Sequence, residues 1–368
     1  MMNLAYVTTH DVLNKATWSK DLQGLCAASY YLAKNLIDEN TEINHIGSLD
    51  KKFAALTRAK WTFYRYVFQK DYYRWAEPLI VKNYAYQIEK QLKKENSNVV
   101  LCPENVVPIA YLECKQPLVL WTDATLSSLI NFYRHMSNLC GENIQNIYQI
   151  EAAALNRCQL IIYTSNWAAQ TAIQTYGISA DKVKVVPWGA NFECNRTYED
   201  IQEIVKSKVS NPCKLLFIGV DWVRKGGNTA FKVAKELNDT GLETELIVVG
   251  CQPKINEPLP KFVKIIDFID KSQPEGLAKI HKLFTETHFL ILPTLADCSP
   301  HVLAEANSFG VPSLATNVGG IPTIIQNHLN GKTFSLEAHP SEYCNYIVSL
   351  MTNYSEYQQL ALSSFHQY

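Results

Sequence analysis

Short apolar runs bounded by turn residues alternate along most of the chain with longer stretches of helical periodicity. This alternation indicates strand–helix units stacked around parallel sheets. In the first half, a helix from about Ser19 carries apolar or small residues on one face, namely Leu22, Cys26, Ser29, Ala33 and Leu36. The strands expected there are residues 4–9, 42–47, 98–103, 117–123, 160–165 and 183–189.

A polar, strand-poor segment then interrupts the alternation before it restarts. We expect strands at 214–222, 243–250, 263–269, 288–294 and 312–316, with helices near 226–240, 275–286 and 300–309 and a final helix at the end. The predicted fold class is α/β, with two doubly wound Rossmann-like domains. The predicted boundaries are 1–190 for the first domain, 191–213 for a linker, 214–352 for the second domain and 353–368 for a terminal helix.

Composition narrows the class of protein. The chain has 368 residues, which is more than one hydrophobic core usually supports. Its 34 lysine and arginine residues nearly balance its 35 aspartate and glutamate residues, and the net charge is -1. No overall positive field therefore favours binding of nucleic acid. The ten cysteines occur singly, and none are spaced as zinc ligands usually are. This pattern is typical of small buried side chains in a reducing compartment. Neither a leader-like segment nor a membrane-length apolar run is visible. We therefore expect a cytoplasmic protein.

The stretch 293–322 concentrates candidate chemistry just past a buried strand. Ser299 is a favourable N-cap residue, Pro300 suits the first helical position, and Gly310 is a natural helix stop. The first N–H groups of this helix, at residues 301–303, face an anion favourably. Asp297 precedes the helix and Glu305 lies within it, so one carboxylate can accept hydrogen bonds from a sugar and the other from a ribose.

Cations for a diphosphate are expected from two further strand ends. Arg224 and Lys225 follow the first strand of the second domain, and the pair Gly319-Gly320 follows strand 312–316. Arginine binds phosphate in a bidentate manner, lysine supplies a compact charge, and paired glycines permit close backbone approach. Three loops are therefore predicted to converge on one diphosphate.

These residues carry a resemblance. The segments "FIGVDWVRKGG", "ILPTLADCSPHVLAEANSFGVPSLATNVGG" and "EAAALNRCQLIIYTSNWAAQTAIQTYGISADKVKVVPWGAN" resemble the retaining family 4 glycosyltransferases, which have the two-domain GT-B fold with a cleft between the domains. The resemblance covers roughly residues 150–350. It implies transfer of a sugar from a nucleotide-sugar donor, bound by the second domain, to a glycan, lipid-linked or small-molecule acceptor, bound by the first. Retention of anomeric configuration is implied with it.

Residue by residue, the resemblance assigns catalytic positions to Asp297, Arg224, Lys225 and Asp123. The donor-binding positions that it implies are Gly219, Glu305, Ser299, His301, Val302, Gly319 and Gly320. This chain departs from the family at three places. Asp297 replaces the first of two glutamates, Val220 stands where the family has its arginine, and Cys298-Ser299-Pro300 replaces Gly-Phe-Gly. Since Pro300 has no N–H, the diphosphate contact is expected at His301 and Val302.

Several alternatives stay open. No metal or other cofactor is expected if Arg224 and Lys225 neutralise the leaving group, and no Asp-x-Asp pair occurs. An inverting enzyme would need a base in the first domain, for which His10, Asp11 and Asp123 lie past strand ends. Asp123 is equally well explained as the N-cap of a helix beginning near Ala124. Competing functions are a sugar-nucleotide epimerase of the same fold and a non-catalytic nucleotide-sugar binder.

The stretch 51–78 interleaves basic and aromatic residues. One interpretation is peripheral contact with an anionic membrane near a lipid-linked acceptor. The preferred interpretation is a helix with Trp61, Tyr64, Phe68 and Tyr72 on its core side and a solvated basic face opposite.

Overall fold

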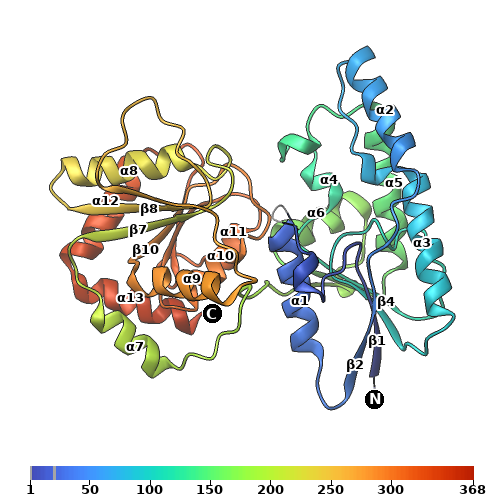
Figure 1. Ribbon diagram of the computed structural model, residues 1–368, viewed down its shortest axis with the longest axis horizontal. Coiled ribbons are helices and arrows are strands. Elements are labelled where there is room, and N and C mark those ends of the chain that lie inside the picture. Colours follow the sequence, from blue (N-terminus) through green and yellow to red (C-terminus); the bar gives the residue numbers. More distant parts are fainter. Residues whose placement is uncertain (1, 20–21) are drawn as a thin grey trace. The chain divides into compact units, whose positions relative to one another are not determined.

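In the computed structural model, which describes residues 2–19 and 22–368, the chain forms two compact units, Met1–Pro187 and Trp188–Tyr368 (Figure 1). Each unit contains a six-stranded sheet in which every pair of neighbouring strands is parallel. Parallel sheets need helical cover on both faces. The predicted α/β class, with two doubly wound sheets, is confirmed.

The first sheet has the strand order β2-β1-β3-β4-β5-β6. Its strands are β1 (Met2–Val7), β2 (Thr41–Ile46), β3 (Val99–Cys102), β4 (Leu118–Thr122), β5 (Leu160–Tyr163) and β6 (Val183–Val185). Its α-helices are α1 (Gln23–Leu36), α2 (Ala54–Val67), α3 (Pro78–Leu92), α4 (Leu126–Leu129), α5 (Gly141–Arg157) and α6 (Asn166–Tyr176). Short 3-10 turns occur at Lys15–Thr17, Arg74–Ala76, Arg134–Met136 and Ala180–Lys182.

The second sheet has the order β12-β11-β10-β7-β8-β9. Its strands are β7 (Cys213–Ile218), β8 (Thr244–Val249), β9 (Val263–Ile266), β10 (Phe289–Leu292), β11 (Ser313–Thr316) and β12 (Gly331–Phe334). Its helices are α7 (Tyr198–Ser207), α8 (Gly227–Asp239), α9 (Pro274–Glu286), α10 (His301–Asn307), α11 (Ile321–Ile324), α12 (Pro340–Thr352) and α13 (Tyr354–His366).

Strand order reverses once in each sheet. In the first, β1 lies between β2 and β3, so the chain leaves β1 to one side and later returns on the other. In the second, β7 lies between β8 and β10 in the same way. At such a reversal the loops leave neighbouring strands in opposite directions and open a crevice at the carboxyl ends, where α/β proteins bind ligands. Ligand sites are therefore expected at two places, after β1 and β3 in the first sheet and after β7 and β10 in the second.

Two elements differ from the sequence expectations. Strand β12 was not predicted, because Phe334 is the one large apolar residue among its four residues. The 191–213 segment contains α7, whose N-terminus is closed by a capping box between Thr197 and Asp200 and whose Ile201 and Val205 are buried. Helix α7 packs against α13, and α13 also packs against α12, so both contribute to the core of the second unit.

The expected core side of residues 51–78 is correct only in part. Within α2 only Thr57 is buried, whereas Trp61 and Tyr64 are half-buried and Phe68, at the C-terminal end, is 56% exposed. Tyr72 is buried, but it lies beyond the helix. The aromatic residues were assigned to a core face by their spacing, yet only a narrow face of this helix contacts the rest of its unit.

Among the described residues, no helix combines the length and apolarity required to cross a bilayer.

Candidate functional site

The loops after β7 and β10 meet at the strand-order reversal of the second sheet. The carbonyl of Arg224, in the β7–α8 loop, accepts hydrogen bonds from the N–H of Leu295 (2.8 Å) and from the hydroxyl of Thr294 (3.0 Å). Both partners lie in the loop after β10. These bonds fix the backbone of one loop against the other, so the side chains of both loops are held at one place.

Two glycines allow this close approach. Gly226 has φ +78, and a Cβ atom there would lie 1.8 Å from the carbonyl oxygen of Pro293. At Gly227 a Cβ atom would lie 2.2 Å from the ring of the buried Trp222. A larger residue at Gly226 would push the β7–α8 loop away from the loop after β10, and one at Gly227 would displace Trp222 within its own loop. The glycine pair at the start of α8 is thus required by packing and by backbone conformation.

Arg224 and Lys225 both bind Asp297. Lys225 Nζ lies 2.9 Å from each carboxylate oxygen, and Arg224 Nη1 donates to Oδ1 at 3.1 Å and to the carbonyl of Ala296 at 2.8 Å. Asp297 is only 6% exposed. A buried carboxylate is stable only when it is paired and hydrogen-bonded, and here two cations serve one anion. The cluster therefore keeps an excess positive charge.

The third predicted loop reaches the same place. The N–H of Gly320 donates to the carbonyl of Asp297 at 3.4 Å, and Gly319 adopts φ +56. On the opposite side, a Cβ atom at Gly219 would lie 2.9 Å from Cγ of Lys225, so this glycine leaves room for the lysine side chain. Val220, at the position of the family's arginine, is 61% exposed. Arg224 is instead the arginine that reaches Asp297.

Glu305 belongs to a neighbouring cluster. It is 1% exposed and forms an ion pair with Lys271, while the N–H of Asn191 donates to the same oxygen, Oε1, at 3.4 Å. Lys271 was missed by the sequence analysis. The signal was weak, because Lys271 lies in an irregular segment between β9 and α9 where many polar residues occur.

His301 is influenced by the charges of both clusters. Its ring stacks on Trp188, with centroids 4.9 Å apart and planes at 7°, and Nδ1 donates to the carbonyl of Gly189 at 3.2 Å. Burial first, together with the charges of Lys271 and Lys225, lowers the pKa of His301 to about 4. The imidazole is therefore neutral near pH 7. With the proton on Nδ1, Nε2 is an acceptor.

The helix start differs from the expectation. Pro300, with φ -70 and ψ 110, is the N-cap of α10, so Ser299 is not the capping residue and Pro300 is not the first helical residue. The reason is that the ring of Pro300 restricts φ without imposing helical ψ. Ser299 is buried and Val302 half-buried. Helix α10 ends at Asn307, three residues before Gly310, which has φ +62.

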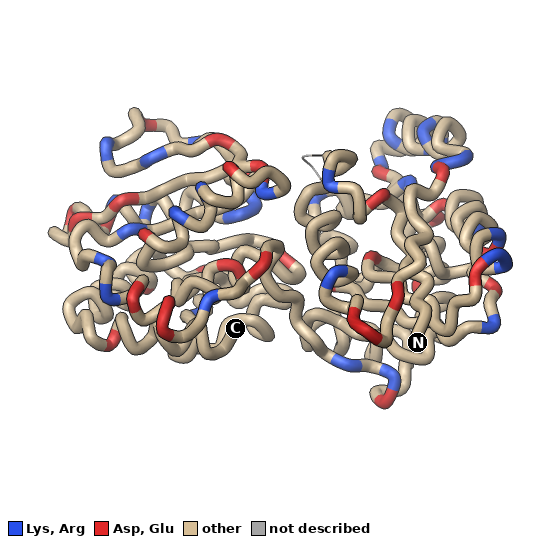
Figure 2. The backbone as a smooth tube through the Cα atoms, turned by 60° about the horizontal axis from the view of Figure 1, so that its bottom comes forward, with Lys and Arg blue, Asp and Glu red and all other residues tan. Residues whose placement is uncertain are grey.

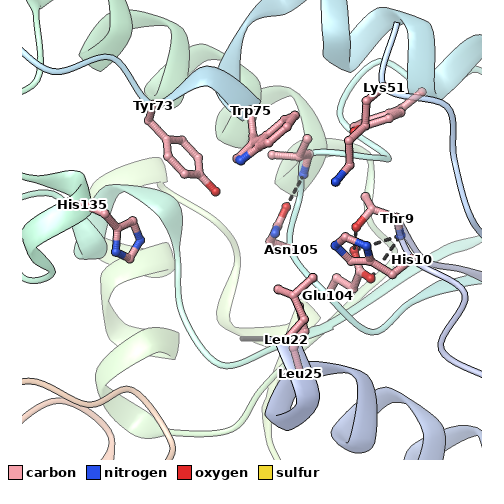
Figure 3. A pocket seen from close by; sticks show the side chains of 12 residues that line it. Thr9, His10, Leu22, Leu25, Lys51, Tyr73, Trp75, Glu104, Asn105 and His135 are labelled. Atoms are coloured by element: carbon pink, nitrogen blue, oxygen red, sulfur yellow. Dashed lines mark hydrogen bonds between the residues drawn. The ribbon is translucent and has the colours of Figure 1, made fainter. Parts of the chain in front are cut away.

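The first unit has a cavity at its own strand-order reversal (Figure 3). It has a volume of about 380 Å³ and is bordered by Thr9 and His10, which follow β1, and by Glu104 and Asn105, which follow β3. Aromatic rings of Tyr73, Trp75, Tyr84 and His135, the apolar Leu22, Leu25 and Val107, and Lys51 complete the lining. Aromatic faces beside a few polar groups are typical of small-ligand sites, including sites for sugars.

Glu104 is the buried charge of this cavity. Its carboxylate accepts from the N–H of Thr9 (3.1 Å to each oxygen) and from the Thr9 hydroxyl (2.7 Å). Burial raises the pKa of Glu104 to about 7 despite these hydrogen bonds and the nearby charge of Lys51. In Figure 3 the ends of His10 and Lys51 point toward the same region. Burial and the charge of Lys51 lower the pKa of His10. Glu104 can thus exchange a proton near neutral pH.

Of the candidate bases predicted in the first domain (His10, Asp11 and Asp123), His10 is the one that borders the cavity. Asp123 follows β4 and is half-buried, and the N-cap of α4 is Thr125, whose hydroxyl accepts from Ser128 N–H at 3.1 Å. The alternative of Asp123 as an N-cap is therefore wrong. Asp11 accepts from the N–H of Asn14 at 3.3 Å. Glu104 was missed, although a carboxylate just past a predicted strand end was the available signal.

Within residues 2–19 and 22–368, no three His, Cys, Asp or Glu side chains are grouped as ligands of one metal ion. The groups that could hold an anion are Arg224 and Lys225 in the second unit. In the first unit, Lys51 and Asn105 border the cavity. Asn105 Oδ1 accepts from Val107 N–H at 2.9 Å.

Comparisons with known proteins agree with the two-domain fold. Residues 212–353 match the family model described as "Glycosyl transferases group 1". Over its whole length the chain superposes on the sucrose-phosphate synthase of Thermosynechococcus elongatus (TM-score 0.67, 12% identity, 100% of this chain and 94% of that chain). It also superposes on Anabaena HepE solved with UDP-glucose (TM-score 0.61, 16% identity, 100% and 94%). The chain has the GT-B fold of these proteins.

Sequence similarity to curated proteins is confined to part of the chain. The D-inositol 3-phosphate glycosyltransferase of Acidothermus cellulolyticus is 24% identical over 209 residues, which are 52% of this chain and 45% of that protein. The chain thus spans about half the length of this relative. The family match within the GT-B fold includes Arg224, Lys225, Lys271, Asp297 and Glu305.

The pKa of Glu104 predicts a pH-dependent contribution to stability. Because the pKa is raised from 4.5 to about 7, the folded protein holds this proton more tightly than the unfolded chain. This contribution is complete below pH 4.5 and is lost as the pH rises to about 7, with an upper bound of about 3 kcal/mol. Thermal unfolding of the wild type and Glu104→Gln from pH 5 to 8 should show the variant gaining relative stability as the pH rises.

Glu113→Gln, at an exposed position, is the matched control. The difference in stability between this variant and the wild type should stay constant over this pH range. A constant difference for Glu104→Gln as well would show that this carboxyl group titrates normally.

Proposed function

We propose that this protein is a glycosyltransferase that moves a sugar from a nucleoside-diphosphate sugar to an acceptor hydroxyl, with the donor bound at Arg224, Lys225 and Asp297. The observation that carries the proposal is the convergence of both cations on one buried carboxylate at the strand-order reversal of the second sheet. The family match over 212–353 includes these residues. HepE, solved with UDP-glucose, makes a UDP-sugar the first donor to test.

The diphosphate competes with Asp297 for the two cations. Arginine and lysine side chains bind phosphate oxygens at least as well as they bind carboxylate oxygens. The excess positive charge of the cluster also favours binding of an anion. Arg224 and Lys225 are already held at fixed places by the loops described above. They need little reorganisation when charge develops on the leaving phosphate. Each such preorganised contact is worth on the order of 3 kcal/mol of the barrier.

In the proposed reaction the bond from the anomeric carbon to the phosphate oxygen breaks and a bond to the acceptor oxygen forms. The departing phosphate takes the acceptor proton, so the products are the glycosylated acceptor and a nucleoside diphosphate. Asp297 orients the sugar and favours positive charge on its ring. Family 4 membership, retention of configuration and independence of metal ions are parts of this proposal. The cation pair supports the last of these, since it supplies the charge that a metal would otherwise provide.

Glu305 and His301 are proposed to bind the nucleoside. Oε2 of Glu305 would accept a ribose hydroxyl, with Lys271 compensating the buried carboxylate. The acceptor is proposed to lie in the cavity of the first unit, with a sugar ring against Trp75 or Tyr73 and hydroxyl groups on Glu104 and Asn105. Carbohydrates combine apolar ring faces with hydroxyl groups, which suits this mixture of aromatic and polar lining.

Lys225→Ala tests the diphosphate contact. It should weaken binding of UDP by tenfold or more and leave binding of uridine nearly unchanged, because only the diphosphate meets the ammonium group. Calorimetric titration of the full chain measures both. Lys232→Ala, an exposed lysine on α8, is the control and should change neither. Equal losses for UDP and uridine would contradict the assignment.

Asp297→Asn separates catalysis from binding. Removing the negative charge frees Arg224 and Lys225 for the diphosphate, so UDP should bind as tightly as before or several-fold more tightly. Transfer and donor hydrolysis should fall on the order of 100-fold, since the sugar loses its carboxylate. Steady-state kinetics with a panel of nucleotide sugars provides the rates. An unchanged rate with every active donor would show that Asp297 takes no part in the chemistry.

A further inference from the structure

Helix α2 presents large apolar side chains to solvent. Tyr66 is 80% exposed, and five others along and beside the helix are about half exposed, namely Phe53, Leu56, Phe63, Val67 and Phe68. Leu56, Phe63 and Val67 are spaced by seven and four residues, which places them on one face of the helix. Six large apolar side chains exposed on and beside one helix are a concentration that marks an interaction site on a folded protein.

The other face of α2 is fastened to its unit mainly by polar contacts. Lys60 forms ion pairs with Glu77 and Glu142, and the hydroxyl of Tyr64 donates to Glu142 at 2.5 Å. Arg74, in the 3-10 turn after α2, donates to the carbonyl of Ala54 at 2.8 Å. In Figure 1, α2 reaches beyond the neighbouring helices of its unit and away from the strands. The apolar side chains are therefore left outside the core by the way the helix is attached.

The same segment is basic. Residues 51–70 contain six basic residues and no acidic residue: Lys51, Lys52, Arg58, Lys60, Arg65 and Lys70. Lys60 is paired as described, and Arg65 pairs with Asp71 at 3.0 Å. Lys52 and Arg58 are exposed and have no ion-pair partner among the described residues. The basic positions along α2 can be followed in Figure 2. The surface thus combines apolar contact area with an excess of positive charge.

Aromatic rings gather at the C-terminal end of the helix. The ring of Phe63 lies 5.5 Å from that of Phe68 and 5.6 Å from that of Tyr64, measured between centroids. Arg65 lies over Trp61 at 5.1 Å. Aromatic rings beside basic side chains are enriched where a protein meets the headgroup region of a bilayer, since each ring has an apolar body and the cations remain near the lipid phosphates.

We propose that α2 and its flanking residues, 51–70, bind the surface of an anionic lipid bilayer, with the helix lying in the plane of the interface. Charge complementarity selects this occupant. A second copy of the chain would bring two basic helices together, and a neutral apolar partner would leave the cations without counter-charges. Amphipathic helices with a basic face bind anionic lipids in this manner. The proposal rests on α2 alone and is independent of the proposed function.

Sedimentation of the full chain with lipid vesicles tests the proposal. The wild type should bind vesicles of about seven parts phosphatidylcholine to three parts phosphatidylglycerol at least tenfold more tightly than pure phosphatidylcholine vesicles, and added salt should weaken this binding. Tyr66→Ser/Val67→Ser should reduce the partition coefficient at least tenfold at any salt concentration. Lys52→Glu/Arg58→Glu should reduce it at least tenfold at low salt only.

Two matched controls lie elsewhere in the same unit. Ile37→Ser removes an exposed apolar side chain, and Lys93→Glu/Lys94→Glu reverses two exposed charges, and neither should change vesicle binding by more than about twofold. The α2 substitutions are at exposed positions, so thermal unfolding should be unaltered, and UDP binding should be retained. Equal binding to both kinds of vesicle, no binding to either, or equal losses in the control variants would overturn the proposal. Loss of UDP binding by Lys225→Ala with vesicle binding intact would concern the proposed function alone.

Discussion

The candidate site depends on one buried carboxylate shared by two cations. Burying the ionised carboxylate of Asp297 would lower the stability of the fold if either Arg224 or Lys225 were missing, because a buried charge requires a compensating charge. The ion pairs also join the loop after β7 to the loop after β10. A single interaction therefore both stabilises the junction and holds the cations in place.

The topology explains why these residues meet although they are far apart in the sequence. Strands β7 and β10 are neighbours, yet the chain visits β8, β9 and α9 between them. The two loops leave the sheet in opposite directions, and hydrogen bonds to the Arg224 carbonyl together with the ion pairs of Asp297 join them. The first unit repeats this arrangement at β1 and β3, where the carboxylate of Glu104 is bound to Thr9. In both units a buried carboxylate after one central strand is bonded to the loop after its neighbour.

Much of this could be predicted from the sequence because strand ends are visible in it. The apolar runs before Gly219 and Asp297 fixed two central strands, and parallel strands bring their carboxyl ends to one edge, so the meeting of Arg224, Lys225 and Asp297 could be anticipated. Lys271 could not, because its position depends on the path of an irregular segment with no periodicity. The spacing of Phe68 in turn suggested a core face, but spacing does not reveal which face of a helix its unit covers.

The central claim is that Arg224 and Lys225 bind a diphosphate in place of, or together with, Asp297. A crystal structure of the full chain with UDP bound tests it most directly. The account predicts phosphate oxygens within hydrogen-bonding distance of Arg224 Nη1 and Lys225 Nζ, with longer distances from these atoms to the Asp297 carboxylate. A diphosphate bound elsewhere, with both cations still paired to Asp297, would contradict it.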